Sequence, residues 1–245
     1  MLHVELPGKP FDATLAAALL EMIPAADDLE AVPVLLLTAP AGADFAPLGV
    51  AAASGDLPPG LRDGAPGGVV ARCVERLARF AGISVAALCG ETAGCGAELA
   101  LACDLRVAST GGSLSFPHVR HQRVPGCGAT QRLPRLAGPA AALRILLLGQ
   151  AVAGPRLEEL GLATVVAGNE AAAMAAAVAL AETLAAESAP ALRACKEAVL
   201  GGADLSLREG LRLEADLAVL LHTSADRTEG IRAFLEKRPP RLEGR

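Results

Sequence analysis

The chain of 245 residues has no tryptophan, no tyrosine and only five phenylalanines. It has no basic run either, and its formal net charge is −5. Proteins that bind nucleic acid usually combine a basic surface with aromatic side chains that stack on bases, so we expect no nucleic-acid partner. Hydrophobic residues still make up 52% of the chain. We therefore expect one large globular domain, or one with a small appendage, around an aliphatic core.

Apolar runs long enough to cross a membrane are also missing. The run Ala140–Leu148 is interrupted by Arg144 and is too short to span a bilayer. The N-terminus, MLHVELPGKP, lacks the basic-then-apolar pattern of a signal peptide. We therefore predict a cytoplasmic protein that makes no use of a membrane.

No two cysteines have C-x-x-C spacing, and no histidine lies at a zinc-site offset from a cysteine pair. We therefore expect no metal site. Free cysteine behaves as a small hydrophobic residue and is usually buried. Buried, reduced thiols are accordingly expected at Cys73, Cys89, Cys95, Cys103, Cys127 and Cys195.

The first part of the chain alternates between helix and strand patterns. The helices expected are Asp12–Met22, with Asp12 as N-cap, and Val69–Phe80. The buried strands expected are Val34–Thr38 and Ser84–Cys89. A loop rich in Gly, Pro and Ala, about Pro47–Gly68, is the expected mobile segment. This order indicates an α/β fold in which helices cover a sheet.

After Gly138 the pattern is almost entirely helical, with one short strand expected at Leu162–Ala167. We predict an α/β core over residues 1–138 and a helical region over 139–245, within one structural unit. In the Ala-rich helix, Met174, Val178 and Leu184 are expected to pack. The helices predicted are 139–148, 155–160, 170–186, 190–200, 206–221 and 224–237.

Two Gly-rich turns stand out between Cys89 and Arg135. The first contains Gly94 and Gly96 and opens a short apolar helix, with Glu98 in its first turn; the second contains Gly126 and Gly128 and opens another helix. Such turns expose backbone N–H groups at a helix N-terminus, where they can stabilise an oxyanion. A second strand-end turn, AGAD at 41–44, occupies an equivalent position. The two turns could therefore each direct one N–H group at a common point.

Four segments resemble the enoyl-CoA hydratase/isomerase (crotonase) superfamily: AGAD at 41–44, GAELALACDLRVAS at 96–109, PGCGATQRLPRLAG at 125–138 and GIRAFLEKRPP at 230–240. The resemblance runs over most of the chain, roughly Pro33 to Arg238. It implies a spiral of ββα units with a helical C-terminal region that forms trimers, often paired into hexamers. It also implies acyl-CoA thioester substrates and no metal or redox cofactor, with coenzyme A present only as part of the substrate.

The resemblance also implies a set of site residues. The oxyanion hole would consist of the backbone N–H groups of Ala43 and Cys95, where Cys95 replaces the family's usual glycine. Glu98 matches one of the two glutamates that the hydratases use for acid/base chemistry. The second glutamate, expected after a proline, falls on His118, and His121 would be a neighbouring solvent-facing or wall residue. Histidine exchanges protons near neutral pH, so the acid/base role can persist in altered form.

The expected CoA contacts are Ala41, beside the oxyanion turn, and Lys237 and Arg238, reaching the phosphates of a neighbouring subunit. The chain enters AGAD directly from Thr38, without the basic and aromatic residues usual there, so one phosphate contact is expected to be missing. The acyl pocket would be lined by residues 47–68, whose sequence does not predict the acyl group.

Hydratase-like lyase chemistry is the leading hypothesis. Isomerisation or decarboxylation needs only one acid/base group and the hole, and a degenerate member would bind acyl-CoA or a partner enzyme without turnover. His222 is a second candidate histidine. A triad of Ser109, Asp104 and His118 is disfavoured because no G-x-S-x-G elbow surrounds the serine. Neither Gly-rich turn has the third glycine and distal acid of a dinucleotide site.

Overall fold

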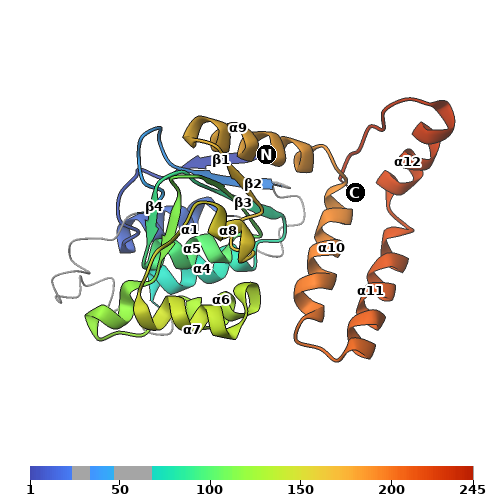
Figure 1. Ribbon diagram of the computed structural model, residues 1–245. Helices are drawn as coiled ribbons and strands as arrows, with labels where there is room; N and C mark the ends of the chain where they lie inside the picture. Colours follow the sequence, from blue (N-terminus) through green and yellow to red (C-terminus); the bar gives the residue numbers. More distant parts are fainter. Residues whose placement is uncertain (24–33, 47–67, 245) are drawn as a thin grey trace.

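The computed structural model describes residues 1–23, 34–46 and 68–244 (Figure 1). Its main sheet has five parallel strands in the order β1-β2-β3-β5-β8. Strands β2 and β3 are buried along their whole length, as the sequence predicts. The strand bounds are β1 Leu2–Glu5, β2 Val34–Thr38, β3 Ile83–Leu88, β5 Leu105–Ser109 and β8 Val165–Ala167.

A second, three-stranded sheet lies beside the first. It contains β4 (Glu91–Ala93), β6 (Ser113–Ser115) and β7 (Val152–Ala153). The strands β3 and β4 follow each other in the chain but belong to different sheets, and so do β5 and β6. Helix α5 (Cys95–Ala102) follows the first pair, and α6 (Ala129–Ala137) follows the second. This repetition is the expected spiral of ββα units, so the predicted fold class is confirmed.

Helices cover both faces of the main sheet. On one face lie α1 (Ala13–Met22), α4 (Val69–Ala78) and α5, and on the other lies α9 (Glu170–Ala185) (Figure 1). The helix α7 (Pro139–Leu148) packs on α6, and the short α8 (Pro155–Glu159) leads to β8. Because β8 and α9 belong to this layered core, the chain after Gly138 still contributes to it. The domain division at Gly138 stays a prediction.

Side chains at the helix starts explain where several helices begin. Asp12 accepts a hydrogen bond from Leu15 N at 2.9 Å, so the predicted N-cap of α1 is confirmed. Asn169 accepts a hydrogen bond from Ala172 N at 2.8 Å at the start of α9. Each cap satisfies an amide that has no partner inside its helix.

Three further helices form an arm that extends from the core: α10 (Ala189–Gly202), α11 (Leu207–Leu221) and α12 (Ala225–Glu236) (Figure 1). Lys196 of α10 anchors the arm, since its Nζ donates to Phe80 O at 2.8 Å and to Asp104 Oδ2 at 2.7 Å. Asp104 also accepts from Ser84 N at 2.8 Å, just before β5. It thus ties the turn between α5 and β5 to strand β3.

One sequence prediction is corrected. Cys195 is exposed and Cys95 is only partly buried, because they lie on the arm and at the first Gly-rich turn. The packing predicted for α9 is confirmed, since Met174, Val178 and Leu184 are partly buried against the core. The fully buried residues of this helix are three alanines spaced by four, Ala173, Ala177 and Ala181.

No single helix among the described residues is long and apolar enough to cross a membrane; α9 and α10 reach that length only as a pair bent by 107°.

Candidate active site

The two strand-end turns predicted to converge lie in direct contact. Asp44 Oδ1 accepts a hydrogen bond from Glu91 N at 2.6 Å, and Ala93 N donates to Ala46 O at 2.9 Å. Gly96 lies so close to Ala46 that an added Cβ would overlap its side chain. The sequence therefore needs glycine at position 96 to bring the turns together.

The two amides predicted to form the oxyanion hole differ in their present hydrogen bonding. Cys95 is the first residue of α5, and no acceptor for its N–H group is seen in the described part of the chain. First-turn amides of this kind carry the positive end of the helix dipole. The Ala43 N–H group instead donates to Pro40 O at 3.0 Å within its own turn.

Glu98 is fully buried in the first turn of α5, as its position after the Gly-rich turn predicts. Its Oε1 accepts hydrogen bonds from Cys127 N at 2.8 Å and from Ala129 N at 3.0 Å. These amides belong to the second Gly-rich turn, at the N-terminus of α6. Two amides and a helix N-terminus stabilise one carboxylate oxygen and fix the orientation of the side chain.

The other oxygen of Glu98 faces His118. Nε2 of His118 lies 3.5 Å from Glu98 Oε2, and the histidine side chain is only 13% exposed. Within the described residues, neither Glu98 Oε2 nor His118 Nδ1 has a hydrogen-bond partner. The 3-10 helix η1 (Pro117–His121) positions the histidine. The structure thus brings together the two side chains that the sequence singled out as acid/base candidates.

Sequence reasoning missed Cys127, which lies beside this pair. The Sγ atoms of Cys95 and Cys127 and a carboxylate oxygen of Glu98 all lie within 4.8 Å of one another. The signal available was the PGCG turn, because a Gly-rich helix start attracts a carboxylate. Spacing along the chain could not show that the carboxylate comes from α5.

The thiols and His118 perturb one another. A hydrogen bond with Cys127 lowers the pKa of the Cys95 thiol to about 6, against the effect of burial. The same hydrogen bond, together with burial, raises the pKa of Cys127. Burial lowers the pKa of His118, but the interactions of its ring with the Cys95 thiol and the Glu98 carboxylate outweigh burial and raise that pKa to about 9. Shifts of this kind cluster at functional sites.

Other candidates lie elsewhere or have structural partners. Lys237 and Arg238 follow α12 on the arm, apart from Ala41 in the core, so one chain does not bring the three predicted CoA contacts together (Figure 1). Arg238 pairs with Glu229 and with Glu236, at 2.6 Å each.

The two other candidate histidines and the triad candidate do not join the acid/base pair. His222 ends α11 on the arm, and His121 is partly exposed at the end of η1. Ser109 Oγ donates to Cys89 O at 2.7 Å, while Asp104 pairs with Lys196. The disfavoured triad is therefore not assembled. The predicted loop and acyl-pocket wall at Pro47–Gly68 fall, apart from Gly68, outside the described residues.

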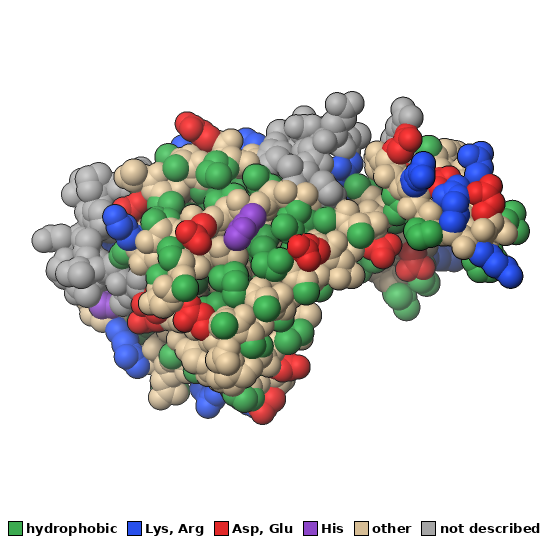
Figure 2. All heavy atoms as spheres, turned by 90° about the horizontal axis from the view of Figure 1, so that it is seen from above, with side chains coloured by type: hydrophobic (Ala, Val, Ile, Leu, Met, Phe, Trp, Pro, Cys, Tyr) green, Lys and Arg blue, Asp and Glu red, His purple; other side chains and the backbone are tan. Residues whose placement is uncertain are grey.

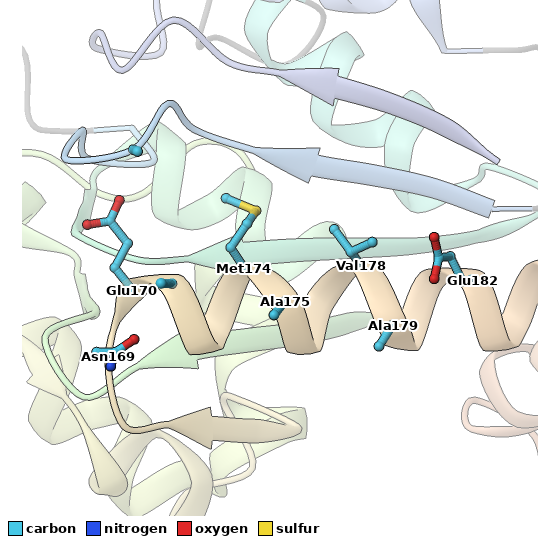
Figure 3. Close-up of a pocket in the computed structure, with 9 residues that line it drawn as sticks. Asn169, Glu170, Met174, Ala175, Val178, Ala179 and Glu182 are labelled. Atoms are coloured by element: carbon cyan, nitrogen blue, oxygen red, sulfur yellow. The ribbon is translucent and has the colours of Figure 1, made fainter.

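A groove of about 860 Å³ runs along α9 and reaches Ala41 at one end (Figure 3). Met174 and Val178 supply much of its apolar wall, and Glu170 accepts a hydrogen bond from Gly42 N at 2.6 Å. Seen from above, this face of the core carries apolar side chains interrupted by acidic ones (Figure 2). The groove borders the oxyanion turn but holds neither Glu98 nor His118.

The chain is similar to known proteins along most of its length. The family model for enoyl-CoA hydratase/isomerase matches residues 52–245. A 2,3-dehydroadipyl-CoA hydratase from Escherichia coli is 34% identical over 170 residues, which cover 69% of this chain and 66% of that protein. A probable enoyl-CoA hydratase from Bacillus subtilis is 37% identical, covering 70% of this chain and 66% of its own. The matched segments thus span slightly less than two thirds of these relatives.

Solved structures extend the similarity to the whole fold. An enoyl-CoA hydratase subunit I from Geobacillus kaustophilus superposes with a TM-score of 0.84 at 34% identity, covering 99% of this chain and 94% of that one. An enoyl-CoA hydratase from Bacillus anthracis superposes with a TM-score of 0.85 at 27% identity, covering 98% and 91%.

Proposed function

We propose that this chain, which belongs to the enoyl-CoA hydratase/isomerase family, adds water across the double bond of an enoyl-CoA thioester. The observation that carries the proposal is the buried Oε2 of Glu98, which has no hydrogen-bond partner in the described part of the chain and faces His118 at 3.5 Å. Burying a carboxylate oxygen without a hydrogen bond lowers stability, and proteins keep such costly groups mainly at functional sites. The curated relatives that act on enoyl-CoA substrates support the same reaction class.

The thioester oxygen would bind at the N-terminus of α5. The Cys95 N–H group donates one hydrogen bond, and the Ala43 N–H group donates a second by exchanging its Pro40 acceptor for the substrate oxygen. As water adds to the β-carbon, negative charge moves to this oxygen and gives an enolate. Each preorganised donor contributes about 3 kcal/mol to the stability of such a transition state.

Glu98 and His118 would then divide the proton transfers. Glu98 takes a proton from the attacking water through Oε2, since Oε1 is held by two backbone amides. His118 stands where hydratases place a second glutamate and supplies the proton that the enolate takes at its α-carbon. No group besides these side chains, the two amides and water is needed, so the proposal includes no cofactor beyond the coenzyme A of the substrate.

Turnover of crotonyl-CoA by the purified protein tests this function. Glu98→Gln keeps the side-chain shape and should lower kcat by about 100-fold or more, the usual effect of losing a general acid or base. Glu21→Gln, at an exposed position of α1, is the matched control and should leave kcat unchanged. An unaltered rate in Glu98→Gln would rule out Glu98 as the base.

A gain of hydration in His118→Glu would show that position 118 controls the reaction type, and His118→Ala shows whether the imidazole transfers a proton at all.

A second candidate is binding of an acyl-CoA without efficient turnover. The hydrogen bond from Ala43 N to Pro40 O favours it, because one predicted oxyanion donor is already occupied. Isomerisation and decarboxylation use the same hole with one acid/base group. Thermal stabilisation by a CoA thioester without hydration of crotonyl-CoA, or product analysis of a 3-enoyl or malonyl-type thioester, would distinguish these reactions.

The same proposal includes a homotrimer, alone or paired, in the cytoplasm. Helix α11 has no buried residue in the single chain, although leucines follow its length. A neighbouring subunit would cover this surface and carry its Lys237 and Arg238 toward the CoA phosphates bound beside Ala41.

A further inference from the structure

The residues around Glu98 include more metal-binding atoms than hydration requires. Cys95 Sγ, Cys127 Sγ and a carboxylate oxygen of Glu98 lie within 4.8 Å of one another, although they come from two separate Gly-rich turns. His118 Nε2 lies 3.5 Å from Glu98 Oε2. Two sulfurs and one carboxylate oxygen therefore surround a single point in the site, and the His118 ring lies beside the Glu98 carboxylate.

We propose that these side chains form a binding site for a thiophilic divalent cation, with Zn²⁺ as the ion and Cys95, Cys127 and Glu98 as its ligands. His118 is the fourth ligand. Structural zinc sites are tetrahedral and take Cys, His and carboxylate ligands. Sulfur ligands select zinc over magnesium or calcium, which prefer oxygen.

The burial of the cluster provides an independent reason for a bound cation. Glu98 is fully buried, and within the described residues its Oε2 has no hydrogen-bond partner. A cation bound directly to Oε2 would compensate for that buried charge at shorter range than the His118 ring, which lies 3.5 Å away. The Oε1 atom stays on the two amides of the α6 turn, which orients Oε2 as an outer-shell contact orients a ligand.

Small side-chain rotations would bring these ligand atoms from their present separations, within 4.8 Å, to those of a zinc site. With Zn–S of about 2.3 Å and Zn–O of about 2.0 Å, neighbouring ligand atoms of a tetrahedron lie about 3.3–3.8 Å apart. Cys127 is buried, while Cys95 is partly exposed and leaves an entry path from solvent. Binding would displace the protons of both thiols and leave His118 neutral.

The ion would take the oxygen that the proposed hydration needs, so Zn²⁺ should inhibit turnover. That consequence rests on the proposed function, but the site itself does not. Metal binding is measured without substrate, so an inactive protein can still bind zinc, and an active one can fail to bind it.

The experiment is zinc titration of the full chain by calorimetry, after reduction and chelation, with all six thiols verified as free. We expect one Zn²⁺ per chain. Changes to residues that only contact a ligand cost up to about 100-fold in metal affinity, so loss of a ligand in Cys127→Ser should cost at least about that much. Cys195→Ser, at the exposed thiol, is the matched control and should bind like the parent.

Cobalt substitution in the unaltered protein gives a reading that does not depend on a variant's folding. Tetrahedral d–d bands with a sulfur-to-cobalt charge-transfer band are expected. Absence of saturable zinc binding, an octahedral cobalt spectrum without sulfur charge transfer, or parental affinity in a folded Cys127→Ser protein would each overturn the proposal.

Discussion

At the residue scale, Glu98 shows how a buried carboxylate can be both fixed and reactive. One oxygen accepts hydrogen bonds from Cys127 N and Ala129 N, while the other has no hydrogen-bond partner in the described part of the chain and faces His118. The amides lower the cost of burying the charge, and their geometry prevents the side chain from rotating away. The free oxygen is thus held in place before any ligand arrives.

Cys95→Pro tests the oxyanion role of a single amide. Proline is tolerated at the first position of a helix, so this change removes the N–H donor with little effect on α5. We expect kcat for crotonyl-CoA hydration to fall by about 100-fold, the usual cost of losing one oxyanion donor.

Cys95→Ala is the control, because it keeps the amide and removes only the thiol. Its rate should stay within a few-fold of the parent. Equal rates for the proline and alanine variants would show that the Cys95 amide does not hold the thioester oxygen.

Sequence alone predicted Glu98 and its neighbour His118, because both follow recognisable local motifs. It did not predict Cys127, or the amides that hold Glu98, because these contacts depend on how α5 and α6 meet in space. It also gave no sign that the Ala43 N–H group bonds to Pro40 O. This hydrogen bond forms because the backbone of residues 40–43 turns back on itself, which the residue types alone do not predict.

At the element scale, α9 packs on the sheet through alanine. Ala173, Ala177 and Ala181 are fully buried against strands β2, β3 and β5. A period of four places them on one face of the helix, and their small side chains allow a close approach. The sequence correctly predicted a packed helix, and Met174, Val178 and Leu184 do pack beside this face, but it did not single out the three alanines that are fully buried.

Ala177→Leu should therefore destabilise the protein. The larger side chain has no space between α9 and the sheet, so overpacking should lower the free energy of unfolding by about 1–3 kcal/mol. Ala179→Leu, on the exposed face of the same helix, is the matched control and should change it by less than about 0.5 kcal/mol. Urea unfolding measures both, and equal stabilities would contradict the packing described for α9.

The end of the arm is closed by an ion pair that should depend on pH. Hydrogen bonds from Arg238 and from Arg241 N lower the pKa of Glu229 from 4.5 to about 2. A carboxyl group with a lowered folded-state pKa contributes stability above its unfolded pKa, and loses it as the pH falls through the folded value. The contribution should therefore be complete above about pH 4.5 and disappear toward pH 2.

Glu229→Gln measures this effect. The difference in amide-exchange protection of α12 and residues 237–244 between parent and variant should be constant from pH 8 to about 5 and vanish near pH 2. A difference that is unchanged at pH 2 would mean that the carboxylate is not responsible. The pair is solvent-exposed, so added salt should also reduce the difference.

At the scale of the whole molecule, the single chain leaves a large apolar surface uncovered. The exposed side chains of the arm include Leu207, Leu211, Val219, Leu220 and Phe234. Several large apolar side chains left exposed on one part of a folded chain indicate an interaction surface. The anchor through Lys196 holds α10 on the core, so α11 and α12 remain available to another subunit.

A closed trimer would satisfy two observations at once. It would cover α11, and it would bring Lys237 and Arg238 of one subunit near Ala41 of another, which the single chain does not do.

Light scattering after size exclusion should give about three or six times the chain mass of 24.7 kDa. Phe234→Asp, which puts a charge on a side chain that is 83% exposed, should shift the protein toward monomer. Leu147→Asp, 61% exposed on α7 of the core, is the control that should leave the trimer intact. A monomeric parent protein that hydrates crotonyl-CoA would show that the arm has another partner and that Lys237 and Arg238 do not bind the substrate from a neighbouring subunit.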